Sequence, residues 1–129
     1  MAKFLSQDWL DQARQLAEDQ PAFDGATAKV QFVVSRGREG DIKFHELLEN
    51  GKLLDARLGE LPDADLTLTL PYADAAAVQR GELDPSVAFM QGRLKVAGDT
   101  GKLIDLLPLT RSPEYARLQD RVREITEFE

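Results

Sequence analysis

The sequence contains no cysteine, one histidine and one tryptophan among 129 residues. Without cysteine, the chain has no disulfides, thiolate nucleophiles or cysteine-ligated metal sites. No apolar run approaches the roughly 18 residues that a membrane-spanning helix needs, and the N-terminus lacks the pattern of a signal peptide. We therefore expect a cytoplasmic protein without stable membrane insertion.

Positive charge is also scarce: 16 lysines and arginines stand against 23 aspartates and glutamates, which gives a net charge of −7. Nucleic-acid binding needs a basic surface along the phosphates, so we expect no nucleic-acid partner. The same deficit disfavours electrostatic adhesion to anionic membranes. Hydrophobic residues make up 43% of the chain, and its length is that of a single globular domain.

Helical spacing of apolar residues marks both ends of the chain. Ser6 is a suitable N-cap for a first helix, whose inward face would carry Trp9 and Leu10. A final helix is predicted from Ser112 onward, with an apolar stripe formed by Tyr115, Leu118, Val122 and Ile125. This stripe either packs on the domain or contacts a partner, such as a second copy of the chain in a homodimer.

Alternation of apolar and polar residues predicts five strands, at 29–34, 41–49, 53–58, 64–71 and 93–97. Asn50 and Gly51 form the pair typical of a type I′ turn, so the second and third strands should form a hairpin. The order of helices and strands predicts an α+β fold. Its core would be a five-stranded, mainly antiparallel sheet with helices packed on one face.

The most informative segment runs from Gly81 to Gly98. Gly81 ends one helix, and Asp84 caps a short helix that begins with Pro85. An apolar Phe-Met pair, a glycine turn and the fifth strand follow, and an apolar helix is predicted at 99–107, ended by Pro108. No side chain in this segment suggests a reaction centre, so we interpret it as the wall of an apolar, lipid-binding pocket.

This segment and its flanks, residues 64–107, resemble the sterol carrier protein 2 domain family. The resemblance rests on Ala-Asp-Leu-Thr-Leu-Thr-Leu from residue 64, Gly-Glu-Leu-Asp-Pro from residue 81, and Ala-Phe-Met-Gln-Gly-Arg-Leu-Lys-Val-Ala-Gly-Asp from residue 88. It implies a non-enzymatic domain whose sheet and helices enclose an apolar tunnel for fatty acids, fatty acyl-CoA, sterols or other lipids. Arg93 stands where the family often has lysine. The C-terminal helix is an addition to a minimal family domain.

We therefore expect a sterol-carrier-like, lipid-binding domain at 1–109 and an amphipathic helix at 110–129 packed on it. The predicted ligand-lining set combines the inner face of the sheet with the flanking helices. It comprises Phe32, Phe44, Leu68, Leu70, Phe89, Met90, Gln91, Leu94, Val96, Leu103, Ile104 and Leu107. Gln91 could hydrogen-bond a lipid headgroup. The apolar members could equally fill a solid core, because packed apolar residues are the norm.

Two other classes of function stay open from the sequence. A protein-interaction or dimerisation module of the same fold would have a closed pocket and an exposed stripe on the last helix. An enzyme would need a base or nucleophile, but His45 has no partner at a suitable spacing. Asp63 and Asp65 fit solvated turn carboxylates better than an acid pair. We therefore predict no catalytic residue, metal site or cofactor.

Overall fold

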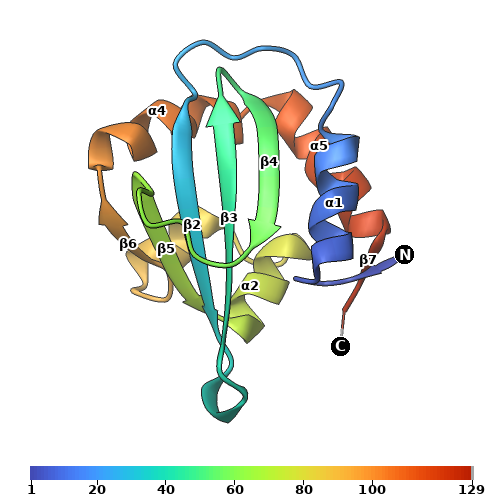
Figure 1. The fold of residues 1–129 in the computed structure, drawn as a ribbon, viewed down its shortest axis with the longest axis vertical. Helices are drawn as coiled ribbons and strands as arrows, with labels where there is room; N and C mark the ends of the chain where they lie inside the picture. Colours follow the sequence, from blue (N-terminus) through green and yellow to red (C-terminus); the bar gives the residue numbers. More distant parts are fainter. Residues whose placement is uncertain (129) are drawn as a thin grey trace.

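The computed structural model describes residues 1–128 and confirms the α+β architecture (Figure 1). Its sheet has the strand order β4-β3-β2-β5-β6. The β2/β5 pair is parallel and the other three neighbouring pairs are antiparallel, so the sheet is mixed but mainly antiparallel. The strands are β2 (Ala28–Ser35), β3 (Asp41–Glu49), β4 (Lys52–Leu58), β5 (Leu66–Pro71) and β6 (Lys95–Gly98).

The described chain also contains five α-helices and one short 3₁₀ helix, η1 (Gly37–Glu39). The α-helices are α1 (Gln7–Leu16), α2 (Tyr72–Gln79), α3 (Pro85–Met90), α4 (Thr100–Thr110) and α5 (Pro113–Glu124). The side chains of Ser6, Asp84, Asp99 and Ser112 each accept a hydrogen bond from a backbone N–H in the first turn. The helix starts are therefore fixed by local sequence, because these caps satisfy otherwise unpaired donors.

The predicted end of α4 at Pro108 is wrong. The helix continues to Thr110, with Pro108 inside its last turn. A proline inside a helix removes the hydrogen bond to the carbonyl four residues earlier, here that of Ile104. Ile104 lies on the exposed side of α4, where water can satisfy this carbonyl. The helix therefore tolerates the lost bond.

A second, two-stranded parallel sheet joins the chain ends and has no counterpart in the prediction. It pairs β1 (Ala2–Lys3) with β7 (Thr126–Glu127). Trp9 Nε1 donates a hydrogen bond of 2.8 Å to Thr126 Oγ1, which fixes α1 against this sheet. Strands of two residues are too short to show an alternating pattern, which is why the sequence did not reveal them.

The helices cover one face of the five-stranded sheet, and α1 lies beside the edge strand β4 (Figure 1). The apolar residues beneath them form two separate clusters. The first joins Val34, Phe44 and Leu70 of the sheet to α1, α2 and α5. The second joins Val30 and Leu66 to α4. Phe32, in the central strand β2, packs against both clusters, so the core is divided in the middle of the sheet.

Candidate functional site

The sheet members of the predicted ligand-lining set lie together on the covered face. Phe32, Phe44, Leu68 and Val96 occupy one row across four strands, because Phe32 pairs with Phe44 and Leu68, and Leu68 pairs with Val96. The rings of Phe32 and Phe44 stack with a centroid distance of 4.5 Å and an angle of 4°. Phe32, Leu68 and Val96 are only half-buried, whereas Phe44 and Leu70 are buried.

The remaining members of the set fall into two groups. Leu103 and Leu107 of α4 are half-buried, and Leu103 packs against the second apolar cluster, as does Val96. Leu94 packs against the first cluster. Three apolar members of the set point away from the covered face. The exposed fraction is 52% for Phe89, 83% for Met90 and 62% for Ile104. Gln91 is exposed and accepts a hydrogen bond of 3.0 Å from Arg93 Nη1.

A carboxyl group lies among these apolar residues, on the covered face of β3. Glu46 pairs with Val30 of β2 and Ala56 of β4, which are 2% and 3% exposed. Its neighbours on the same face of β3 are Phe44 and Leu48. Burial raises the pKa of Glu46 from 4.5 to about 7, so this side chain is close to half-ionised at neutral pH.

The Glu46 carboxyl interacts with a polar side chain of α5, which is linked in turn to α2. The charge of Glu46 acts on the phenol of Tyr115 in α5, and burial together with that charge raises the pKa of Tyr115 to about 12. Gln119, one turn further along α5, hydrogen-bonds the Tyr115 side chain. Gln79 of α2 donates a hydrogen bond of 3.0 Å to Gln119 Oε1. A polar chain thus runs from α2 through α5 toward the sheet.

Sequence reasoning missed Glu46 as a functional candidate, although a signal was present. The alternation Ile42, Phe44, Glu46, Leu48 places this glutamate on the apolar face of its strand. A charged residue at a position that the alternation assigns to the core is unusual, and it marks the residue as a functional candidate.

The other residues weighed from the sequence have ordinary structural roles. His45 lies on the opposite face of β3, with Nδ1 3.1 Å from the carbonyl oxygen of Gly59. Lys29 binds Asp63 through a contact of 2.7 Å, which lowers the pKa of that carboxyl. Asp65 accepts a hydrogen bond from the Lys29 backbone N–H. Both aspartates therefore belong to the turn before β5 and do not form an acid pair.

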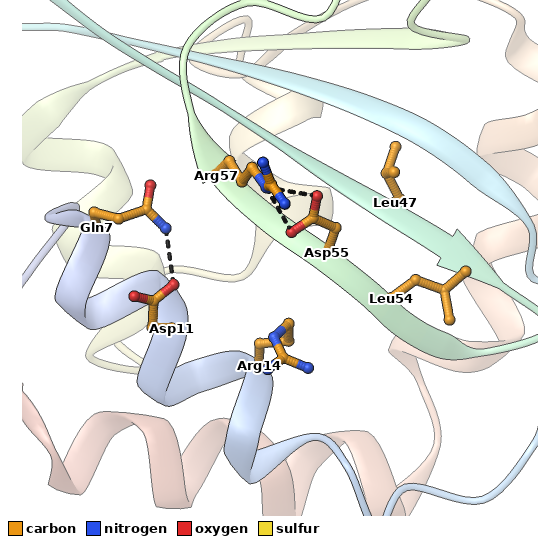
Figure 2. A pocket seen from close by; sticks show the side chains of 7 residues that line it. All are labelled: Gln7, Asp11, Arg14, Leu47, Leu54, Asp55 and Arg57. Atoms are coloured by element: carbon orange, nitrogen blue, oxygen red, sulfur yellow. Dashed lines mark hydrogen bonds and ion pairs between the residues drawn. The ribbon is translucent and has the colours of Figure 1, made fainter.

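Hollows open on the surface of the described part of the chain, and two of them are defined by their lining residues. The first, of about 760 Å³, lies between α1 and the outer side of β4, and Figure 2 shows its lining. That lining is largely polar, with an Asp55–Arg57 ion pair on β4 and Gln7 bound to Asp11 on α1. The second, of about 400 Å³, lies beside η1. Neither is lined by a residue of the predicted ligand-lining set.

Residues 1–128 were also considered for a metal site and a membrane span, and they contain neither. No group of three or more His, Asp and Glu side chains is placed to hold a metal ion. No helix there is long and apolar enough to cross a membrane.

Comparison with known proteins places this architecture in a family. The profile of the SCP-2 sterol transfer family matches residues 8–111, so the chain belongs to that family. Sterol carrier protein 2 of Rattus norvegicus is 40% identical over 62 residues, which cover 45% of this chain and 11% of the rat protein. The chain thus matches only about a tenth of the length of that curated relative.

Solved structures agree on the fold. A crystal structure of sterol carrier protein 2 superposes with a TM-score of 0.71 at 20% identity, covering 94% of this chain and 98% of that one. The apo form of sterol carrier protein 2 from Yarrowia lipolytica gives a TM-score of 0.56 at 28% identity, covering 77% of this chain and 85% of that one. Family membership supports lipid binding or transfer as the general class of function.

Proposed function

We propose that this protein is a non-enzymatic carrier that binds a lipid between its sheet and its helices. The observation that carries the proposal is the divided core. Phe32 lies on the central strand β2 and Leu68 on its neighbour β5, both beneath the helices, yet both keep accessible surface. In a solid core these positions would be the most completely buried, because interiors are close-packed. Partial burial at the centre supports a hollow there.

The residues around this position have the character of a lipid site. Half-buried Val96 and Leu103 adjoin Phe32 and Leu68 in the second cluster, and stacked Phe44 closes the other side. Burial of an acyl chain yields about 0.8 kcal/mol per CH₂, so a chain of about sixteen carbons offers roughly 12 kcal/mol before the cost of association is subtracted. Micromolar or tighter binding of fatty acids, acyl-CoA or sterols follows from these magnitudes.

The exposed members of the predicted set take a different role in this proposal. Phe89, Met90 and Ile104 contribute apolar surface outside the hollow, where they would meet a lipid as it enters or leaves. Gln91, bound to Arg93, would meet a polar headgroup at the same place. The ligand-contacting interior is then formed by the sheet row together with Leu94, Leu103 and Leu107.

We propose that residues 1–109 form the carrier domain and that α5 packs over its sheet as part of the same domain. Leu118 and Val122 of α5 are buried in the first cluster, and Tyr115 packs against the second. A protein-interaction module, or a homodimer formed through this stripe, would need the stripe to be exposed. Its burial against the sheet therefore disfavours both alternatives. A cytoplasmic location of the carrier is part of this proposal.

Native mass spectrometry of the purified protein, followed by organic extraction of any bound molecule, tests the carrier function. We expect a co-purifying lipid, or saturable binding of fatty acids, acyl-CoA or sterols to the emptied protein. Val96→Phe fills the hollow from the edge strand and should weaken binding at an unchanged thermal midpoint. Ala97→Phe, on the exposed opposite face of β6, is the matched bulky control. Absence of binding to all three lipid classes would refute the carrier function.

A further inference from the structure

The surface hollow beside η1, of about 400 Å³, differs in charge from the rest of the chain. Its lining consists of Arg36, Arg38, Glu39 and Tyr72. Two guanidinium groups against one carboxylate leave this lining with one net positive charge, whereas the whole chain carries −7. Salt screens charges that lie more than about 10 Å away, so a small anion in the hollow meets mainly the local positive charge. The hollow is therefore suited to an anionic ligand.

The fold brings two of these side chains together where β2 and β5, the parallel pair of the five-stranded sheet, both end. Ser35 pairs with Pro71, and each is the last residue of its strand. The next residues, Arg36 before η1 and Tyr72 at the start of α2, therefore leave the sheet side by side. Figure 1 shows the loop between β2 and β3 and the start of α2 at the same end of the sheet. In α/β sheets, ligands bind just beyond the carboxyl ends of parallel strands.

Both guanidinium groups have N–H donors left for a ligand. Arg36 is half-buried, and its Nε and Nη2 donate hydrogen bonds of 3.4 and 3.3 Å to the carbonyl oxygens of Gly40 and Glu39. These bonds hold the group in place and use two of its five N–H donors. The Glu39 carboxylate, 3.8 Å from Nη1, is too distant to accept a third. Arg38 is exposed, and its side chain makes no hydrogen bond or ion pair with residues 1–128.

The phenol of Tyr72 adds a hydroxyl donor to the same hollow. Its half-buried ring contacts Phe4 edge-on at a centroid distance of 5.8 Å, which fixes the direction of the side chain. The hydroxyl has no hydrogen-bond partner among residues 1–128. Of the fully buried side-chain polar atoms of these residues, only Arg121 Nε lacks a partner, so the Tyr72 hydroxyl keeps accessible surface. It can therefore donate to an anion in the hollow that Tyr72 lines.

We propose that the hollow formed by Arg36, Arg38 and Tyr72 binds the phosphate group of a water-soluble organic phosphate. The planar fork of a guanidinium matches two phosphate oxygens, and a phosphate offers acceptors for both arginines and for a hydroxyl. A hollow of about 400 Å³ lies in the range of small-molecule sites, so an organic part fits beside the phosphate. The net charge of −7 disfavours a second source of phosphate, the headgroups of an anionic membrane. This site is separate from the proposed lipid site and does not depend on the carrier function.

Titration of the isotope-labelled protein with phenyl phosphate, followed by NMR, tests the site. At low salt and about pH 7.5 a phosphate monoester carries close to two negative charges. We expect saturable shifts of the backbone signals of residues 36–40 and 72, and of the Nε–H signals of Arg36 and Arg38. Phenyl sulfate has the same shape and one negative charge, so it should bind several-fold more weakly. Inorganic phosphate should also bind more weakly, because it leaves the rest of the hollow empty; binding equal to that of phenyl phosphate would overturn the organic ligand.

Arg38→Gln is the decisive variant, because Arg38 has no structural partner whose loss could disturb the fold. It should weaken the binding of phenyl phosphate about tenfold, the fold-change of one hydrogen bond to a charged group. Tyr72→Phe keeps the ring against Phe4 and should weaken binding by a smaller factor. The matched control is Arg111→Gln at the C-terminal end of α4. Arg111 is likewise exposed and without a side-chain partner among residues 1–128, and its variant should bind as wild type.

Two results would overturn the phosphate site. One is the absence of saturable shifts at residues 36–40 and 72, and the other is equal weakening by Arg38→Gln and Arg111→Gln. Cosedimentation with phosphatidylcholine vesicles, with and without phosphatidic acid, tests the membrane source. Cosedimentation that requires phosphatidic acid and Arg38, without any binding of phenyl phosphate, would overturn the soluble ligand. None of these results bears on the carrier function, which is tested by bound lipid.

Discussion

Replacing Glu46 by glutamine should stabilise the protein above neutral pH much more than in acid. Burial raises the pKa of Glu46 in the folded protein from 4.5 to about 7. As the pH rises from about 4.5 to about 7, the unfolded chain releases a proton that the folded protein retains. The free energy of unfolding therefore falls across this window and stays lower above it. The full contribution of this carboxyl is present only below about pH 4.5.

The size of the effect follows from the same two values. One pH unit corresponds to about 1.36 kcal/mol, so the interval from 4.5 to about 7 corresponds to about 3 kcal/mol. This is a large fraction of the stability of a domain of this size. The glutamine amide has its own burial cost, but that cost does not depend on pH. The difference between the two proteins should therefore change by about 3 kcal/mol between acid and alkaline conditions.

Urea unfolding of the lipid-free wild type, Glu46→Gln and the control Glu49→Gln, an exposed glutamate on the same strand, at about pH 4 and about pH 8 measures this difference. Lipid must be removed first, because a ligand that binds only the folded state adds its own stabilisation. Other carboxylates titrate in the same range, but they are common to all three proteins and cancel in the comparison. A Glu46→Gln difference that is the same at both pH values would refute the burial of this carboxyl.

Two further substitutions test how the structure is held together. Thr126→Val removes the acceptor for Trp9 Nε1 and leaves this buried N–H unpaired, which should cost about 1–3 kcal/mol in urea unfolding followed by Trp9 fluorescence; unchanged stability would contradict the role of this hydrogen bond. Gly98→Ala places a Cβ 2.3 Å from the Asp65 carbonyl oxygen at φ +109, whereas Gly25→Ala at φ +88 meets nothing within 4 Å. We expect Gly98→Ala to lower the free energy of unfolding by more than about 2 kcal/mol and Gly25→Ala to lower it by about 1 kcal/mol. Equal losses would show that the backbone near Gly98 shifts to remove the clash with the Asp65 carbonyl oxygen.

Local sequence determined much of the fold. The four helix starts follow from side chains that cap the next backbone N–H groups, and the hairpin of β3 and β4 follows from Asn50 and Gly51, both at positive φ. These features depend on neighbours within a few residues, so a sequence pattern contains them. The apolar row on the sheet was predictable for the same reason, because alternate residues of a strand share one face.

Contacts between distant residues required the tertiary structure. The Trp9–Thr126 hydrogen bond spans 117 positions, and the two-residue strands that it supports have no periodicity of their own. Pro108 remains helical because Ile104 faces solvent, a property of how α4 packs. Phe89 and Met90 look like core residues in the sequence, but α3 presents them outward.

Glu46 combines both kinds of information. Alternation within β3 determined that it shares a face with Phe44 and Leu48, and the sequence alone contained that fact. Only the packing of the helices over this face determined that its carboxyl loses hydration and that its charge acts on the phenol of Tyr115. A side chain's direction is set by its own strand, whereas its pKa and its partners are set by whatever the rest of the chain places above it.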